Sequence, residues 1–223
     1  MGSLILVRHA TTAASESGRN LGQRGDPPLA AAGQQLATRL AAALRAELDE
    51  LPHDQIRLVS SPALRCRQTM AAIVRRLGVL AEVERAAGVL EIDYGEWDGL
   101  TADECRTRDP ERRAAWEADP YMTRCPGGES GADVARRAFT VLTPLEAWLA
   151  ADRARCGIVV AHNHVNRLWL CALMGWPMRE YRDRLAQDPG GYSLVTFGPQ
   201  APVVRRVNAA PEGRLGEPTV TSV

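Results

Sequence analysis

The stretch Leu4-Ile5-Leu6-Val7-Arg8-His9 decides how the chain folds. Four consecutive apolar residues that end abruptly in two basic ones are typical of a strand buried on both faces of a sheet. A second stretch of the same kind, residues 157–161, ends in His162. The carboxyl ends of parallel strands meet at one edge of a sheet, and ligands bind there. We therefore expect two central strands that each deliver a histidine to the same edge.

Segments typical of strands and of helices alternate along the rest of the chain. Leucines at every fourth position predict a helix over residues 33–48, and Ser60-Ser61-Pro62 predicts a strand end, a helix cap and a first-turn proline. This alternation indicates an α/β fold, a mostly parallel sheet flanked by helices on both faces in three layers. The other expected strands are residues 56–59, 80–83, 192–197 and 203–207, and the other expected helices are 62–77, 130–149 and 164–174.

The chain of 223 residues suits a single domain. Residues 96–127 are highly charged and interrupted by prolines, which predicts a small insertion of helices and loops over the active site. We expect one α/β domain over residues 1–207, with this insertion, and a flexible C-terminal tail over 208–223. In the insertion, Trp97 and Trp116 are expected to pack inside, and the arginine-rich stretch 106–113 to be a solvated helix face.

Composition limits the classes of function. Basic and acidic residues balance at 27 each, so we expect neither nucleic acid nor a membrane as a partner. All 27 basic residues are arginines, which excludes lysine chemistry such as Schiff bases and P-loop phosphate binding. The five cysteines are irregularly spaced, and no run has the length of a membrane span. These features predict a cytoplasmic protein; whether it forms a homo-oligomer is left open.

The expected strand ends bring together residues suited to phosphate chemistry. Arg8, His9 and His162 end two strands, and Ser60-Ser61-Pro62 leads to Arg65. The planar guanidinium suits bidentate contact with phosphate oxygens. A neutral imidazole among guanidinium groups has a lowered pKa and is available as a nucleophile. Glu91, just after Leu90, is the candidate carboxylic acid.

With these residues in view, the sequence resembles the histidine phosphatase superfamily, which has the phosphoglycerate-mutase-like fold. The stretch from Arg8 to Thr12 is similar to the family's Arg-His-Gly signature, with Ala10 in place of the glycine. Further blocks agree in order and spacing over residues 4 to about 197. They are Ser60-Ser61-Pro62 with Arg65, the acid block Glu91-Ile92-Asp93-Tyr94-Gly95, Pro126-Gly127-Gly128-Glu129-Ser130 with Arg137, and Val160-Ala161-His162 with Arg167.

The resemblance implies a phosphatase that hydrolyses a small phosphorylated metabolite through a phosphohistidine intermediate, without a metal and without a cofactor. It implies that His9 attacks phosphorus, and that Glu91 protonates the leaving oxygen and then activates water. It further implies that the phosphoryl oxygens are held by four residues: Arg8, Arg65, Thr12 and a protonated His162.

Departures from the family pattern leave alternatives open. The chain lacks the Trp-Asn and the Glu-Arg-His-Tyr-Gly elements of mutases, which argues against, but does not eliminate, a phosphoglycerate-type mutase. A binding module for phosphorylated ligands that does no catalysis is the alternative from another class. Asp93 remains an alternative to Glu91 as proton donor. The role of His164, where the family often has glycine or asparagine, is unassigned, and a solvated or packing histidine is the simpler expectation for it and for His53. Ser130, with Glu129 before it, is a candidate helix cap.

Overall fold

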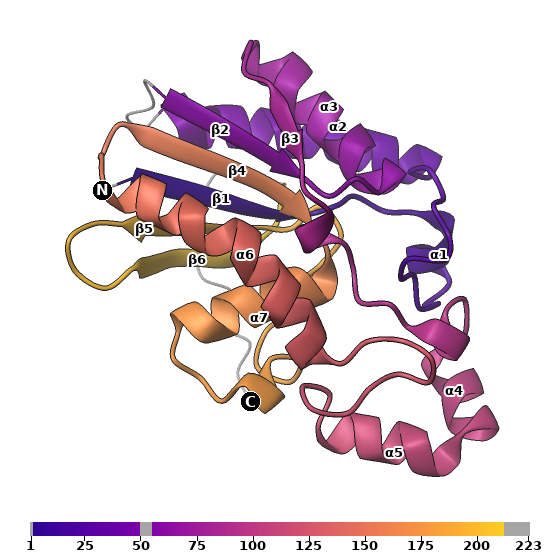
Figure 1. Ribbon diagram of the computed structural model, residues 1–223. Coiled ribbons are helices and arrows are strands. Elements are labelled where there is room, and N and C mark those ends of the chain that lie inside the picture. The colour runs from indigo at the N-terminus through magenta and orange to yellow at the C-terminus, as the bar shows by residue number, and fades with distance from the viewer. Residues whose placement is uncertain (1, 50–54, 212–223) are drawn as a thin grey trace, which may run out of the picture.

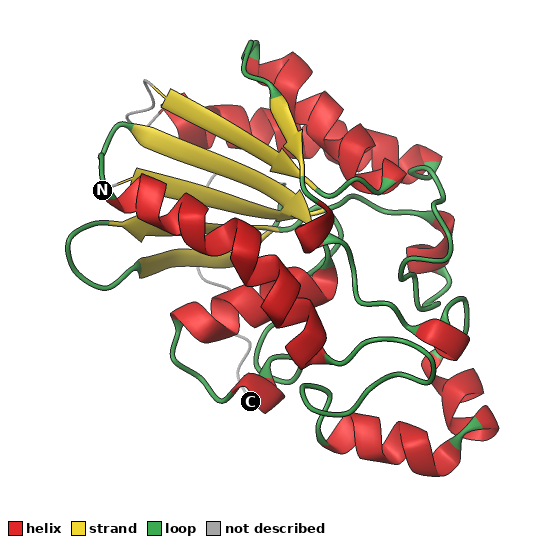
Figure 2. Ribbon diagram, viewed as in Figure 1, coloured by secondary structure: helices red, strands yellow, loops and turns green. Residues whose placement is uncertain are grey.

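A computed structural model describes residues 2–49 and 55–211, which contain one six-stranded sheet of order β3-β2-β4-β1-β5-β6. Strands β1 to β4 pair in parallel, while β5 and β6 are antiparallel additions at one edge (Figure 2). The expected α/β fold with a mostly parallel sheet is confirmed. The strands are β1 (Gly2–Arg8), β2 (Gln55–Ser60), β3 (Val83–Arg85), β4 (Arg155–Ala161), β5 (Tyr192–Phe197) and β6 (Val203–Ala209).

Helices cover both faces of the sheet (Figure 1). Because side chains alternate along a strand, Ile5 and Val7 of β1 point into one hydrophobic core and Leu4 and Leu6 into another. The first core is closed by α2 (Ala31–Asp49) and α3 (Leu64–Leu77), and the second by α6 (Gly131–Ala150) and α7 (Asn163–Leu173). The leucine stripe at 40, 44 and 48 lies in the first core, as its spacing predicts.

The register between the two central strands sets the position of the site. Strands β1 and β4 are neighbours, with Arg8 opposite Ala161. His9 and His162 follow these two paired residues directly, so both histidines leave the sheet side by side. The prediction that two central strands each bring a histidine to the same edge of the sheet is therefore confirmed.

The insertion consists of short helices beside the sheet's carboxyl edge. It contains η2 (Gly95–Trp97), α4 (Ala102–Arg108) and α5 (Pro110–Ala118), and its two tryptophans are buried with ring centroids 6.0 Å apart. The remaining short elements are α1 (Ala13–Glu16), η1 (Ala87–Val89) and η3 (Met178–Glu180). The expected solvated face over 106–113 is wrong at Arg113, which is buried, stacks over Trp116 at 4.6 Å and binds Glu117.

Three boundaries differ from the sequence expectation. Strand β3 lies at Val83–Arg85 rather than at 80–83, because pairing with β2 begins at Val83 and Leu80 is fully exposed. Helix α3 begins at Leu64, after Ala63, so Ser60-Ser61-Pro62 precedes the helix and does not cap it. Strand β6 continues to Ala209, two residues into the expected tail, and residues 212–223 lie outside the described part.

Two further features concern the whole described part of the chain. None of its helices is both long enough and apolar enough to cross a membrane. All five cysteines are free thiols, and all are buried.

Candidate active site

His9 follows strand β1 and is held in one tautomer. Its Nδ1 lies 2.8 Å from the carbonyl oxygen of Ala10. A carbonyl only accepts, so Nδ1 carries the proton and Nε2 keeps its lone pair. Burial, and then the positive charges of Arg65 and Arg8, hold the pKa of His9 well below its ordinary value. The protein thus presents His9 as a neutral imidazole whose Nε2 keeps a lone pair, as a candidate nucleophile requires.

His162 lies edge-on to His9, with the ring centroids 5.2 Å apart. It is fully buried, and its Nε2 lies 2.7 Å from the Ser61 hydroxyl oxygen. Burial, followed by the charge of Arg65, holds its pKa well below the ordinary value, so the protein alone does not keep this imidazole protonated. A phosphate dianion beside the ring raises that pKa, so the charge expected on His162 arrives with the anion.

Arg8 and Arg65 bring unpaired donors to the two histidines. Arg65 is 1% exposed; it donates from NH2 to the Gly22 carbonyl at 3.0 Å and lies 3.9 Å from Asp26. Its Nε and NH1 have no hydrogen-bond partner in the described structure, and the ion pair of NH1 with Asp26 is long. Arg8 donates to the carbonyl of Gln187, while its Nε is also unpaired. Buried donors without acceptors indicate a site that an anion completes.

A cavity of about 230 Å³ opens beside Arg65. The segment that carries Gly22 and Asp26 forms one side of it, and Pro62 and Ala63 before helix α3 form another. Leu90, the residue before Glu91, also lines it. The cavity therefore joins Arg65, the candidate phosphate-binding arginine, to the acid block.

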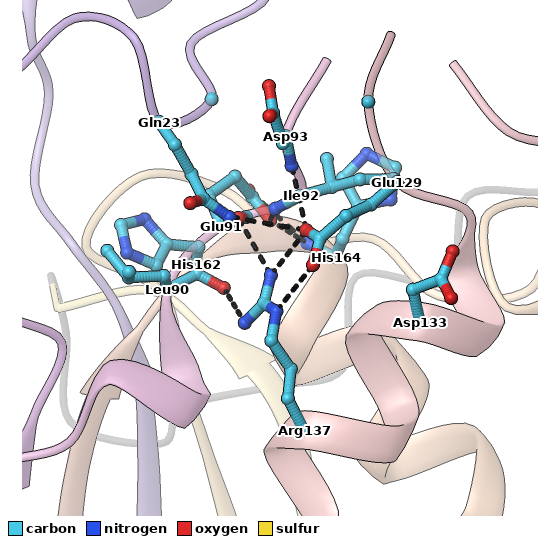
Figure 3. A network of polar contacts seen from close by, with 12 residues as sticks. Gln23, Leu90, Glu91, Ile92, Asp93, Glu129, Asp133, Arg137, His162 and His164 are labelled. Atoms are coloured by element: carbon cyan, nitrogen blue, oxygen red, sulfur yellow. Dashed lines mark hydrogen bonds and ion pairs between the residues drawn. The ribbon is translucent and has the colours of Figure 1, made fainter. Parts of the chain in front are cut away.

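Glu91 is buried, and Figure 3 shows it in a network of polar contacts with His164 and Arg137. Its carboxylate accepts the N–H of Ile92 at 3.0 Å and that of His164 at 3.2 Å. Burial raises the pKa of Glu91, although these two hydrogen bonds and the charges of Arg65 and Arg8 oppose the rise. Asp93, the alternative proton donor, uses its carboxylate to accept the N–H of Gly95 at 2.8 Å. The geometry favours Glu91 as the general acid.

An ion pair between Arg137 and Glu129 holds the acid block in place (Figure 3). Arg137 of helix α6 donates to the carbonyls of Leu90 at 2.6 Å and Glu91 at 2.9 Å, and to Glu129 at 2.8 and 2.9 Å. Glu129 accepts the N–H of Asp93 at 2.9 Å. The sequence placed Glu129 and Arg137 in one block without giving them this role. The cap itself is Ser130, in a capping box with Asp133.

Of the two expectations for His164, the structure supports packing over solvation, because its side chain is 1% exposed. Its Nε2 lies 2.8 Å from the Tyr94 hydroxyl, and its Nδ1 lies 2.7 Å from the Tyr181 hydroxyl. Trp116 of α5 packs against the same ring, with centroids 6.2 Å apart. His164 thus connects the acid block, helix α7 and the insertion.

Thr12, the expected phosphate ligand at the end of the signature stretch, has a hydrogen-bond partner within the chain. It caps helix α1, where its hydroxyl accepts the N–H of Ser15 at 3.2 Å. Its contact with phosphate stays a prediction.

Unpaired buried polar atoms gather at this edge of the sheet. Such atoms are rare in folded proteins and indicate a ligand site when they cluster. Within the described ranges, they include Arg8 Nε, Arg65 Nε and NH1, Asn163 Oδ1, Asn166 Oδ1, Arg167 Nε and Arg182 Nε. The same ranges contain no group of three His, Cys, Asp or Glu side chains that could hold a metal ion.

Comparison with known proteins identifies the family. The profile of the histidine phosphatase superfamily (branch 1) matches residues 4–210. The chain belongs to this superfamily. Phosphoserine phosphatase 1 of Hydrogenobacter thermophilus is 30% identical over 213 residues, which are 93% of this chain and 92% of that protein. Glucosyl-3-phosphoglycerate phosphatase of Mycolicibacterium vanbaalenii is 29% identical, over 78% of this chain and 75% of that protein.

The fold of this chain is similar to that of solved phosphatase and hydrolase structures. The mycobacterial glucosyl-3-phosphoglycerate phosphatase in complex with VO3 has a TM-score of 0.77 at 24% identity, covering 94% of this chain and all of that one. A protein described as mycobacterial hydrolase 2 has a TM-score of 0.79 at 25% identity, covering 96% of this chain and 93% of that one. The protein is thus a phosphatase of the histidine phosphatase superfamily.

Proposed function

We propose that the protein hydrolyses phosphate monoesters of small metabolites through a phosphohistidine at His9. One observation carries this proposal: a neutral His9, with Nε2 free, lies among Arg8, Arg65 and His162, and a buried Glu91 faces the same group. A nucleophile, an anion cradle and a carboxylic acid are what phosphoryl transfer requires.

In the first step, Nε2 of His9 forms a bond to phosphorus while the bond from phosphorus to the leaving oxygen breaks. Glu91 gives its proton to that oxygen, so the alcohol leaves neutral. Arg8 and Arg65 hold the equatorial oxygens and stabilise their charge in the transition state. His162, protonated beside the dianion, contributes a third positive charge.

In the second step, the carboxylate of Glu91 takes a proton from water. The water oxygen forms a bond to phosphorus while the bond from phosphorus to Nε2 breaks, which releases phosphate and restores neutral His9. Glu91 ends the cycle protonated, as it began. The two arginines and His162 supply the positive charge, so no step of this proposal uses a metal ion or a cofactor.

The proposed substrates are small phosphorylated metabolites. Two relatives, named as phosphoserine phosphatase and glucosyl-3-phosphoglycerate phosphatase, support this class. The cavity beside Arg65, at about 230 Å³, is smaller than ligand pockets of roughly 300–1,000 Å³, which favours a small substrate.

Release of inorganic phosphate from a panel of sugar phosphates, phosphoglycerates, phosphoamino acids and nucleotides tests the proposal. We expect release from at least one class by the wild-type protein, and no activity in His9→Ala. His53→Ala, which changes a histidine outside the described residues, is the control and should keep the activity. We also expect activity to survive a chelator. Full activity in His9→Ala, or loss on chelation that added metal restores, would contradict the mechanism.

The same panel separates hydrolysis from phosphoryl transfer. With 3-phosphoglycerate we expect free phosphate to accumulate, whether or not 2,3-bisphosphoglycerate is added. Rapid conversion into 2-phosphoglycerate with negligible phosphate release would instead support a mutase. Binding of phosphate esters with neither product would support a non-catalytic module.

A further inference from the structure

Two arginines beside the site, Arg167 and Arg182, form no ion pair with a described carboxylate. In the described part of the chain neither forms a hydrogen bond or an ion pair, and the Nε of each is buried without a partner. Both side chains are half-buried rather than free in solvent. Arginines in comparable positions are paired: Arg137 binds Glu129, and Arg113 binds Glu117. A half-buried guanidinium without an acceptor is costly unless a ligand supplies one.

Arg167 lies one helical turn beyond His164 in α7, on the Glu91 side of the site. The N–H of His164 binds the Glu91 carboxylate at 3.2 Å, and residues three apart on a helix are neighbours. Arg182 reaches the same place from another segment. It stacks over Trp116 at 4.4 Å and follows Tyr181, whose hydroxyl lies 2.7 Å from His164.

Arg8 bounds this group on the phosphate side. It donates to the main-chain carbonyl of Gln187, and the side chain of Gln187 accepts from Asn166, the residue before Arg167. The pKa of Arg167 is lowered by burial and then by the charges of Arg182 and Arg8. Three guanidinium groups therefore converge around the first turns of α7, and Glu91 is the carboxylate in their midst.

We propose that Arg167 and Arg182 form a second anion subsite, which binds a carboxylate on the leaving group of the substrate. The inference rests on the proposed function, because Glu91 can protonate the leaving oxygen only if the leaving group lies on its side of the site. That side is where Arg167 and Arg182 stand. The planar fork of a guanidinium matches a carboxylate, and the stacking on Trp116 holds the fork of Arg182 in position.

The subsite names a substrate class: phosphate monoesters whose alcohol carries a carboxylate. Phosphorylated hydroxy acids and hydroxy amino acids belong to it. Arg8 lies between the two anions, so a short alcohol suffices to span them.

Two matched pairs of esters test the subsite. The first is 3-phosphoglycerate and glycerol 3-phosphate; the second is O-phosphoserine and O-phosphoethanolamine. In each pair the first ester has a carboxylate that the second ester lacks. The measured quantity is the ratio of kcat/KM within a pair, for the wild-type protein and for Arg167→Gln, Arg182→Gln and Arg179→Gln. Arg179 is exposed and serves as the matched control.

In the wild-type protein we expect the carboxylate ester to be preferred at least tenfold in one or both pairs. We expect Arg167→Gln and Arg182→Gln to lower that ratio roughly 10- to 100-fold, the range of a hydrogen bond to a charged group. Arg179→Gln should keep the wild-type ratio. Thermal melting of each variant separates loss of folding from loss of selectivity.

Different failures have different meanings. If both esters are hydrolysed with a wild-type ratio near one, or if Arg167→Gln and Arg182→Gln keep the wild-type ratio, the subsite is overturned and the phosphatase proposal stays intact. A third pair, fructose 1,6-bisphosphate and fructose 6-phosphate, differs in a phosphate group. If Arg167→Gln and Arg182→Gln change the kcat/KM ratio of this pair alone, the carboxylate assignment is overturned. Release of phosphate from no ester contradicts the proposed function, and the subsite with it.

Discussion

The carboxylate of Glu91 accepts the backbone N–H of His164, two residues beyond His162. The candidate acid and the candidate phosphate-binding histidine are therefore held by the same helix start, that of α7. The positive end of the helix dipole favours the ionised carboxylate, while burial raises the pKa of Glu91. This balance suits a group that must lose a proton in one step and regain it in the next.

Replacement of Glu91 should affect substrates according to their leaving groups. An alkyl alkoxide needs a proton as it departs, whereas 4-nitrophenolate hardly does. We expect Glu91→Gln to lower kcat roughly 100-fold for an alkyl phosphate but less than about tenfold for the departure of nitrophenolate, which a pre-steady-state burst measures. Glu96→Gln, an exposed neighbour, is the control. Equal losses for both substrates would return the acid role to Asp93.

The phosphoryl group should be found on Nε2 of His9, because Nδ1 donates to Ala10. Glu91→Gln with 4-nitrophenyl phosphate should accumulate the adduct, since the base that activates water is missing. The adduct should be acid-labile and base-stable. A proton–phosphorus correlation spectrum distinguishes the two ring nitrogens. Phosphate on Nδ1, or on another residue, would show that the tautomer assignment or the nucleophile is wrong.

Arg137 should act through Glu91 as a positioning residue. Loss of its hydrogen bonds to the carbonyls of Leu90 and Glu91 frees the acid block. We expect Arg137→Gln to lower kcat for alkyl phosphates about tenfold and to destabilise the fold by about 2 kcal/mol. Arg136→Gln, the exposed neighbour that binds Asp133, should do neither.

A double variant makes the Arg137 prediction specific. If Arg137 acts only by placing the acid, then Glu91→Gln combined with Arg137→Gln should be no slower than Glu91→Gln alone. Strictly additive losses in kcat would show that Arg137 affects turnover by another route.

The fold should lose stability as the pH falls below about 6.5. His9, His162 and His164 are buried, and their pKa values lie well below the ordinary 6.5. Below pH 6.5 the unfolded chain therefore binds protons that the folded chain does not. Each histidine then lowers the free energy of unfolding by about 1.4 kcal/mol per pH unit, until its folded pKa is reached.

Glu91 acts in the opposite direction. The pKa of Glu91 is raised in the folded chain, so Glu91 stabilises the fold as the pH falls toward 4.5. Its effect is that of one proton, whereas the three histidines together involve three protons and act in the destabilising direction. Urea unfolding at pH 7.5, 6.5 and 5.5 measures the net slope. His164→Gln should remove about a third of the histidine contribution. A free energy of unfolding that is constant or rises from pH 7.5 to 5.5 would contradict this account.

Local signals in the sequence predicted the sheet and the side chains that meet at its carboxyl edge. Buried strands end at one edge, so Arg8, His9 and His162 could be brought together without knowledge of the loops. Strand β3 was misplaced because the apolar character of Leu80 outweighed pairing, which the sequence does not display. The role of Ser61 was missed because its partner, His162, is 101 residues away.

The contacts that orient the acid could not be predicted for the same reason. Gln23 reaches Glu129 across 106 residues, and Arg137 reaches Leu90 across 47. Such long-range pairs leave no periodic trace in the chain. Arg167 stands in one of the family blocks and Arg182 in none, and no local pattern shows that both arginines lack an ion-pair partner in the described part of the folded chain.

The buried cysteine thiols can report local opening of the protein through their rates of alkylation. Burial raises the pKa of Cys66, Cys125 and Cys156 to about 12, so scarcely any thiolate exists in the closed protein. Alkylating reagents attack the thiolate, and their rate therefore follows transient exposure of each segment. Cys125 reports exposure of the insertion, and Cys156 reports exposure of the central sheet. Cys66 reports exposure of the site itself, because its Sγ lies 3.5 Å from Nε2 of His162. The order of labelling would time the loosening of these three regions against one another, with no added probe.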